Sequence, residues 1–292
     1  MNKKFLILIV SIITLSILTL FLFQNKGNQF NGEKALALVN DQVGFGFRTP
    51  GSEAHAKTID FIRTNLQNND WNVEIQEETI ENGYTIQNII GKREVNPGPW
   101  IILAAHYDSR FVSDQDPDPE KRTLPVPGAN DGASGVGVLL ELSSVIPRNL
   151  NKNVWLVFFD AEDQGNIENW DWILGSRSFV NQLEGKPDKV VIIDMIGDED
   201  LNLYYEHNSD ASLSEEIWNI ANKNGFGESF IPQYKYRILD DHIPFVEAGI
   251  QAIDIIDFDY PYWHTQNDTV DKVSANSLNA IGKTLFEWLL IP

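Results

Sequence analysis

The chain has 292 residues, with 22 Lys and Arg against 42 Asp and Glu, so its formal net charge at pH 7 is −20. Such a polyanion is repelled by a phosphate backbone, which excludes nucleic acid as a partner. Hydrophobic residues make up 42% of the chain, enough to build a globular core. The absence of Cys excludes disulfides, thiolate metal sites and lipidation on cysteine, so a metal must be held by Asp, Glu or one of the five His.

An uncharged apolar segment covers residues 5–23, directly after Lys3 and Lys4. At about 1.5 Å per residue, a helix of this length nearly crosses a hydrocarbon core of about 30 Å. The two lysines favour a cytoplasmic N-terminus. We therefore expect residues 1–27 to be a membrane anchor, or a signal segment if they are cleaved. A helix buried in a soluble domain is the third interpretation. On the first two, residues 28–292 form an extracytoplasmic domain, membrane-anchored or secreted.

The remainder of the chain predicts a single α/β domain, because helical and strand-like patterns alternate along it. Strands buried on both faces read as continuous apolar runs, so we expect a central mixed, mostly parallel twisted sheet flanked by helices. Helices are predicted over Glu33–Asp41, Ser52–Gln67, Gly132–Val145, Leu213–Asn224 and Ala275–Leu290. Strands are predicted over Val73–Thr79, Tyr84–Ile90, Trp100–Ala105, Val154–Phe159 and Val190–Met195, followed by an apolar segment, Ile250–Ile256. Asp114–Pro127 reads as a long surface loop.

Polar side chains follow the buried strands where each strand ends. His106-Tyr107-Asp108 follows the first, Asp160-Ala161-Glu162-Asp163 the second, and Asp194 stands at the end of the third. Asn130-Asp131-Gly132 opens a helix, and His264 follows the last apolar segment. Ligands bind at the carboxyl ends of strands in open α/β sheets. Any one motif could be a turn or an acidic loop, but their repetition predicts a metal site, and carboxylates with imidazole suit zinc.

Taken in order, these motifs resemble the series of the zinc aminopeptidase family and of its relative, glutaminyl cyclase. The motifs are His106-Tyr107-Asp108, the segment from Gly128 to Gly135, Asp160-Ala161-Glu162-Asp163, Asp194-Met195-Ile196-Gly197 and His264-Thr265. The resemblance covers about residues 31 to 292. It implies the α/β fold of that family, a zinc cofactor, and peptide or protein N-termini as substrates.

Three details resemble the cyclase branch: Leu174-Gly175-Ser176-Arg177, Asp240-Asp241-His242-Ile243-Pro244-Phe245, and Trp263 directly before His264. The segment from His264 to Asp271, by contrast, resembles an aminopeptidase. We therefore expect a zinc-dependent glutaminyl-peptide cyclotransferase, which converts N-terminal Gln to pyroglutamate and releases ammonia. A two-metal aminopeptidase that hydrolyses N-terminal residues from peptides is the alternative.

The cyclase resemblance implies that Asp131, Asp163 and His264 hold one zinc ion and that Glu162 is the general acid and base. The family usually has Glu where this chain has Asp163, so the shorter side chain requires the backbone or the metal to shift. Asp194 and Asp240 match paired catalytic acids, at least one of which should have a raised pKa. Substrate contacts are expected from Trp263, with Tyr260 and Trp170 as further walls of the pocket. Trp172 lies two positions after Trp170, and the spacing from Glu162 leaves open which of the two faces the pocket.

The aminopeptidase resemblance gives the same residues other roles. His106 and Asp194 would bind a second zinc, Asp131 would bridge the two ions, and Glu162 would activate water. Every ligand of that second ion is present, so the sequence leaves open whether one or two zinc ions bind. A non-catalytic, membrane-anchored binding domain is a third hypothesis, which the presence of Glu162 and all ligands disfavours. The remaining histidines, His55 and His207, are expected at the surface.

Overall fold

The computed structural model describes residues 29–95 and 97–291. The predicted anchor, residues 5–23, and the predicted boundary after residue 27 lie outside this part of the chain. Among the described residues, no helix has both the length and the apolar character needed to cross a membrane.

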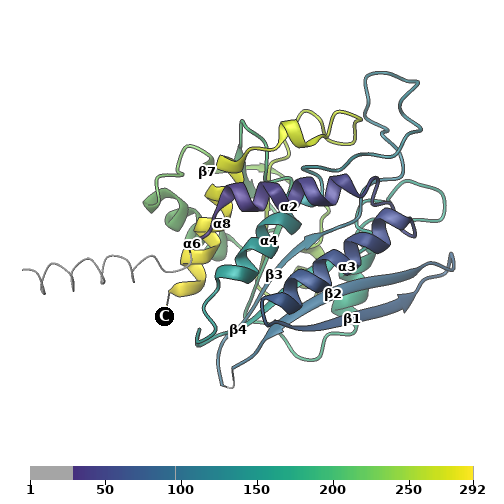
Figure 1. Cartoon of the computed structure of the whole chain (residues 1–292). Helices are drawn as coiled ribbons and strands as arrows, with labels where there is room; N and C mark the ends of the chain where they lie inside the picture. Colours follow the sequence, from purple (N-terminus) through teal and green to yellow (C-terminus); the bar gives the residue numbers. More distant parts are fainter. Residues whose placement is uncertain (1–28, 96, 292) are drawn as a thin grey trace, which may run out of the picture.

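A six-stranded mixed sheet forms the centre of the molecule, with strand order β1-β2-β4-β3-β5-β8 (Figure 1). The parallel strands β4, β3, β5 and β8 make up two thirds of it, and β1 and β2 add an antiparallel pair at one edge. The α/β sheet predicted from sequence is confirmed. The strands are β1 (Asn72–Thr79), β2 (Thr85–Arg93), β3 (Trp100–His106), β4 (Asn153–Phe159), β5 (Lys189–Asp194) and β8 (Ala252–Ile256).

Helices cover both faces of this sheet. The larger layer contains α2 (Gly32–Gly44), α3 (Glu53–Asn68), α4 (Ala133–Val145), α6 (Ala211–Lys223) and α8 (Ala275–Leu290). In Figure 1 helices α2, α4 and α8 lie side by side on that face. The short helices α5 (Leu174–Asn181) and α7 (Ile243–Glu247) cover the other face. A small parallel pair, β6 (Leu203–Glu206) and β7 (Phe230–Tyr236), lies beside the main sheet.

The parallel strands β3, β4, β5 and β8 are mostly apolar because their side chains are buried on both faces. In β3, Leu103 and Ala105 pack into the larger core, whereas Ile102 and Ala104 pack into the smaller one. This is the two-residue alternation of a strand with two covered faces. A continuous apolar run is thus the signature of such a strand, and the sequence prediction of β3, β4 and β5 rested on it.

The small residues at the start of α4 bring its N-terminus against the ends of two strands. A Cβ atom added at Gly135 would lie 2.6 Å from the carbonyl oxygen of Ile193 and 2.7 Å from the Cβ of Ala105. Only glycine permits this approach. Because Ile193 and Ala105 each directly precede a polar residue at a strand end, the contact holds the segment before α4 beside those residues.

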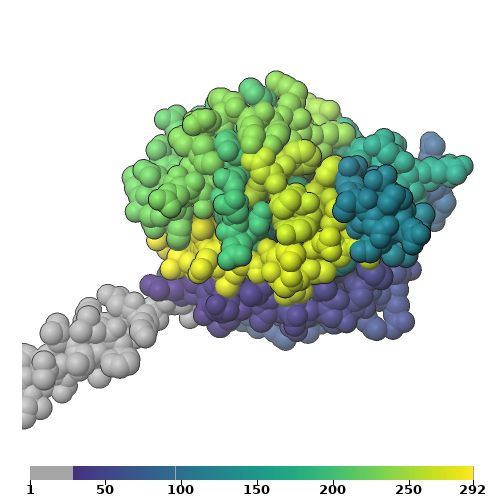
Figure 2. Space-filling view, turned by 90° about the horizontal axis from the view of Figure 1, so that it is seen from above, coloured from purple at the N-terminus to yellow at the C-terminus, as the bar shows by residue number. Residues whose placement is uncertain are grey.

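The structure also contains elements that the sequence patterns did not predict, namely α5, α7, β6 and β7. The short helix α7 spans too few turns for a periodic pattern, and β7 is exposed over most of its length. The predicted loop over residues 114–127 has neither helix nor strand, but it is only partly a surface feature. Its Asp116 is buried and accepts a hydrogen bond from the backbone N–H of Gln266. Figure 2 shows this blue segment lying against the yellow C-terminal region.

Candidate active site and metal centre

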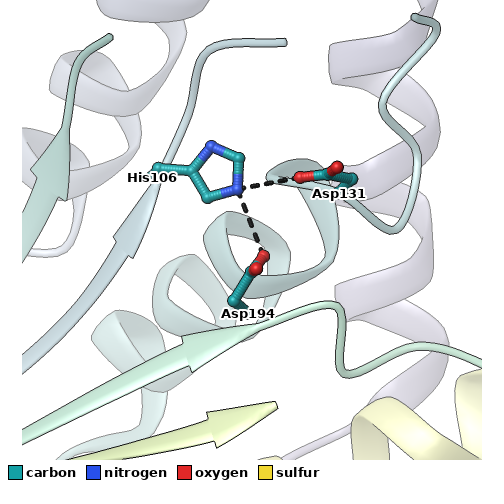
Figure 3. Close-up of side chains that lie close together, drawn as sticks. All are labelled: His106, Asp131 and Asp194. Atoms are coloured by element: carbon teal, nitrogen blue, oxygen red, sulfur yellow. Dashed lines mark hydrogen bonds and ion pairs between the residues drawn. The ribbon is translucent and has the colours of Figure 1, made fainter. Parts of the chain in front are cut away.

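His106, Asp131 and Asp194 meet at the carboxyl ends of the parallel strands. His106 ends β3, Asp194 ends β5, and Asp131 stands just before α4. The Nε2 atom of His106 lies 3.1 Å from Asp131 Oδ1 and 3.1 Å from Asp194 Oδ1 (Figure 3). Figure 3 shows the two carboxylates converging on the same imidazole nitrogen from different elements. The three candidate ligands of the second ion therefore share one site.

Asp131 also faces a second histidine. Its Oδ2 atom lies 3.6 Å from Nε2 of His264, and that nitrogen is 2.8 Å from Asp163 Oδ1. Asp131 thus stands between two ligand groups, with one carboxylate oxygen directed at each. In both groups the three candidate ligand atoms lie within 4.8 Å of one another. The shorter side chain of Asp163 still reaches its group.

The chemistry of these donors fits zinc. Asp131 Oδ2 and Asp163 Oδ2 are buried atoms that accept no hydrogen bond. A buried carboxylate oxygen without a donor is unfavourable unless a cation compensates it. Imidazole with carboxylates, and no sulfur, is a ligand set of catalytic zinc sites that keep one position open. Asp131, Asp163 and His264 would hold one such ion, and His106, Asp131 and Asp194 offer a second position.

The backbone adopts left-handed conformations at three non-glycine residues in this region. The φ angles are 52° at Ala161, 46° at Met195 and 54° at His264. Residues other than glycine rarely adopt such angles, and those that do are concentrated at functional sites. Ala161 directly precedes Glu162 after β4, and Met195 directly follows Asp194 at the end of β5, so the chain turns where the acidic residues of the site stand.

A cluster of carboxylates lies next to the ligand groups. Oxygens of Glu162, Asp240 and Asp241 come within 4.8 Å of one another, and all three side chains are buried. Burial and the charge on Asp240 raise the pKa of Glu162 well above its ordinary value. The same two causes raise the pKa of Asp241. The cluster therefore retains protons at pH values where isolated carboxyl groups have lost them.

The ligand groups also have displaced pKa values in the protein without bound metal. Burial raises the pKa of Asp194 to about 7, although the neighbouring His106 opposes the shift. Burial, helped by the charge on Asp131, raises the pKa of Asp163 to about 6. Burial disfavours the charged form of His264, but the carboxylates around it, Asp163 first, outweigh burial and raise its pKa to about 9. Protons and a metal cation thus compete for the same atoms.

A cavity of about 240 Å³ opens beside these groups. This is below the roughly 300–1,000 Å³ of pockets for drug-sized ligands, so it suits a single amino-acid residue. Its lining combines acidic groups with mostly apolar side chains. The acidic residues and the histidine are Asp131, Glu162, Asp163, Asp194, Asp240 and His264. The other lining residues are Trp172, Met195, Tyr236, Arg237, Ile238, Leu239, Ile256, Phe258 and Trp263.

The tryptophans of the cavity are only partly those named from the sequence. Trp263 lines it and stacks on the imidazole of His264, with ring centroids 3.8 Å apart. Trp170 does not line it and packs instead against Tyr84 and Phe111. The second aromatic wall is Trp172, which lies two positions further along the chain. The sequence could not decide which of the two indoles turns inward, because the loop after Glu162 follows no regular period.

Tyr260 is buried behind the site rather than in the cavity wall. Its hydroxyl donates a 2.7 Å hydrogen bond to Asp268 Oδ1. The two oxygens of Asp268 accept the backbone N–H groups of Asn130 and Asp131, at 2.8 and 3.1 Å. Tyr260 and Asp268 therefore hold the backbone that carries Asp131. Asp268 was not assigned a role from the sequence, although it lies within the segment that resembles an aminopeptidase.

Asp108 supports the other side of the site in the same way. Its carboxylate accepts the backbone N–H groups of Glu162 and Asp163, at 3.1 and 3.3 Å, and the side-chain amide of Gln164 at 2.9 Å. It also lies 3.4 Å from Nδ1 of His106. The His106-Tyr107-Asp108 motif contained this residue, but only the fold shows that it positions the adjacent acids.

Both His55 and His207 were expected at the surface. His207 is exposed, but His55 is buried. His55 is 2% exposed, and its Nε2 atom lies 2.8 Å from Asp160 Oδ1. Asp160 also accepts the hydroxyl of Tyr84 at 2.7 Å. The ionic partner is more than 100 residues away in sequence, so no local pattern indicated that the imidazole is buried.

A model of peptidase family M28 matches residues 88–289, more than half of the chain. The chain belongs to peptidase family M28. Its matched segment contains every candidate ligand described above, and zinc is the metal this family implies.

Both cyclases and peptidases are among the similar proteins. Glutaminyl-peptide cyclotransferase of Drosophila melanogaster is 26% identical over 285 residues, which cover 83% of this chain and 77% of that protein. The crystal structure of Tannerella forsythia glutaminyl cyclase is 33% identical, with a TM-score of 0.85, and the match covers 90% of this chain and 99% of that one. A Zn-dependent exopeptidase from Parabacteroides distasonis ATCC 8503 is 32% identical with the same TM-score and coverage. This M28 chain is thus a glutaminyl cyclase-like enzyme of the zinc aminopeptidase superfamily.

Proposed function

We propose that this enzyme is a zinc-dependent glutaminyl-peptide cyclotransferase, which converts the N-terminal Gln of a peptide or protein to pyroglutamate and releases ammonia. Two kinds of evidence support the proposal. One is the similarity to glutaminyl cyclases over most of the chain. The other is a cavity of single-residue size that is lined by both acidic groups and aromatic rings.

The observation that carries the proposal is the position of Asp240. Its carboxylate lies in one buried group with Glu162 and Asp241, and it lines the same cavity as Asp194. A reaction in which the substrate's own α-amine is the nucleophile needs groups that bind its ammonium form and then accept a proton. This cluster supplies carboxylates for both tasks. A two-metal hydrolysis needs Asp194 as a ligand, and it requires no further buried acid beside it.

The chemistry balances within one substrate molecule. The α-amine nitrogen of the N-terminal Gln forms a bond to its own γ-carboxamide carbon, and the bond from that carbon to the amide nitrogen breaks. Glu162 accepts a proton from the attacking amine and delivers it to the departing nitrogen, which leaves as ammonia. A zinc ion held by Asp131, Asp163 and His264 would polarise the γ-carbonyl group. No water takes part.

The aromatic wall favours this intramolecular reaction over hydrolysis. Trp263 and Trp172 border the cavity next to the metal ligand His264. A compact wall of this kind holds the glutamine side chain folded back on its own amine. Holding reacting atoms in such a near-attack geometry supplies a large part of a rate enhancement by itself.

The proposal is tested by the products of the purified protein. With a Gln-initiated peptide we expect free ammonia, a product lighter by one ammonia, and no free amino acid. A Leu-initiated chromogenic amide is the control, and Glu162→Gln protein provides the background rate. Faster hydrolysis of the Leu substrate than cyclisation of the Gln peptide would contradict the assignment.

A two-metal aminopeptidase is the second candidate, and one observation favours it. Asp131 directs one oxygen at each of two complete ligand groups, as a bridging carboxylate would. Metal analysis of the purified protein separates the candidates, because we expect one zinc per chain for the cyclase and two for the peptidase. Two zinc ions together with release of N-terminal residues would establish the peptidase.

We also propose that the enzyme acts outside the cytoplasm on the N-termini of peptides or proteins, held to the membrane by residues 5–23 or secreted if that segment is cleaved. The support is the apolar run after Lys3 and Lys4. Cell fractionation, followed by protease treatment of intact cells that express the protein, tests the location. A protein found in the soluble cytoplasmic fraction would refute it.

A further inference from the structure

The buried side chain of Arg110 forms an ion pair with the partly exposed Asp114 at the start of the β3–α4 loop, next to the candidate metal ligands. Arg110 is 1% exposed, and its Nε and Nη2 atoms donate to the two carboxylate oxygens of Asp114 at 3.0 and 2.8 Å. This is the bidentate geometry in which a guanidinium binds a carboxylate most specifically. Asp114 is therefore held in one orientation, although its side chain is 37% exposed.

The remaining donors of Arg110 bind the backbone that carries a metal ligand. Nη1 donates to the carbonyl oxygen of Asp163 at 2.8 Å, and Nη2 donates to that of Gly165 at 3.0 Å. The guanidinium also lies over the ring of Trp172, 4.8 Å from its centroid. One side chain thus contacts the backbone of a ligand, the aromatic wall of the cavity and Asp114. Because Asp163 is short, its backbone position directly determines where its carboxylate lies.

Asp114 connects this arrangement to the second ligand. Its Oδ1 atom lies 3.2 Å from Nδ1 of His264, while Nε2 of the same ring faces Asp131 and Asp163. A carboxylate that accepts the Nδ1 proton of a histidine fixes the tautomer with a free electron pair on Nε2 and makes that nitrogen a better ligand. The backbone N–H of Gln115 also donates to the carbonyl oxygen of His264 at 3.2 Å.

We propose that Arg110 and Asp114 are positioning residues that set the zinc affinity of the Asp131–Asp163–His264 site. Asp114 orients His264, and Arg110 orients Asp114 together with the backbone of Asp163. The role requires zinc at this site and holds for either reaction, cyclisation or hydrolysis. Its test is therefore independent of which reaction the enzyme catalyses.

The zinc dissociation constant, measured by competition with a chromogenic chelator, tests the proposal without an activity assay. Outer-shell partners of metal ligands typically contribute 10- to 100-fold in affinity, and we expect Asp114→Asn to weaken zinc binding by about that factor. Glu120→Gln is the matched control. It removes one carboxylate from the same loop, and Glu120 is exposed. This control should leave the dissociation constant unchanged.

Arg110→Lys and the double variant separate a positioning role from general damage. Lysine keeps the charge but cannot form the bidentate pair or hold both carbonyl groups, so we expect weaker zinc binding than in the wild type. Both residues act on one histidine. The loss of zinc-binding free energy in the double variant should therefore be smaller than the sum of the losses in Asp114→Asn and Arg110→Lys. Far-UV circular dichroism of the metal-free variants should match the wild type. Zinc binding by Asp114→Asn that equals the Glu120→Gln control, or a wild-type protein that binds no zinc, would overturn the proposal.

Discussion

Replacement of Glu162 by Gln separates proton transfer from metal binding. The substitution keeps the size of the side chain and removes its charge and its capacity to carry a proton. Glu162 is 8% exposed and belongs neither to the ligand group of His106 nor to that of His264. We therefore expect the variant to bind as much zinc as the wild type. General acid–base groups contribute roughly 10²- to 10⁴-fold to rate, so kcat/KM for a Gln peptide should fall at least a hundredfold, or about 2.7 kcal/mol.

The same substitution should stabilise the protein without bound metal. Burial and Asp240 raise the pKa of Glu162 in the folded state. The folded state therefore binds more protons than the unfolded chain, and this carboxyl group lowers the free energy of unfolding as the pH rises above its unfolded pKa. The neutral side chain of Gln removes this loss of unfolding free energy. The melting temperature of the variant should exceed that of the wild type at pH 8 and match it near pH 4, with roughly 2–4 °C for each kcal/mol relieved.

The assay combines zinc analysis, kinetics on a Gln peptide, and thermal melts of chelator-treated protein at both pH values. Glu184→Gln, at an exposed position after α5, is the matched control and should change none of the three. Loss of zinc from the Glu162 variant would show that Glu162 is a ligand and that its role and that of Asp163 were interchanged. A lower melting temperature at pH 8 would refute the electrostatic argument.

Three further predictions concern the metal site and the cavity. His264→Ala should abolish zinc binding and activity. If one zinc is bound, His106→Ala should retain the metal and part of the activity. Zinc analysis that finds the same loss of metal in both variants would contradict the one-metal assignment. Trp172→Ala should raise KM for a Gln peptide about tenfold or more, because an aromatic contact with the substrate is lost. Trp170→Ala should leave KM unchanged. If steady-state kinetics gave the larger KM for Trp170→Ala, Trp170 rather than Trp172 would contact the substrate. The pKa of His264 is raised to about 9 by the neighbouring carboxylates in the protein without metal, so its stabilising contribution is complete below about pH 6.5 and is lost as the pH rises through 9; chelator-treated protein whose melting temperature rises over this range would contradict that reasoning.

The sequence alone determined the sheet and the residues at its carboxyl edge. The residues of β3 from Ile101 to Ala105 form a short, continuous apolar run, and a run of that length favours a strand covered on both faces over a helix. Parallel strands end at the same edge, so a polar residue directly after each run has to lie near the others. That argument depends only on local pattern and strand direction, and it placed the candidate ligands, from His106 to His264, in one region.

Only the tertiary structure decided which side chains surround those ligands. Trp172 rather than Trp170 faces the cavity, His55 is buried against Asp160, and the β3–α4 loop presents Asp114 to a histidine 150 residues further along the chain. These contacts join segments with no regular period, and their geometry depends on how loops pack after the sheet has formed. A residue's own neighbours in sequence carry no information about such partners, because a hydrogen bond or a ring contact in a loop is selected by the whole fold.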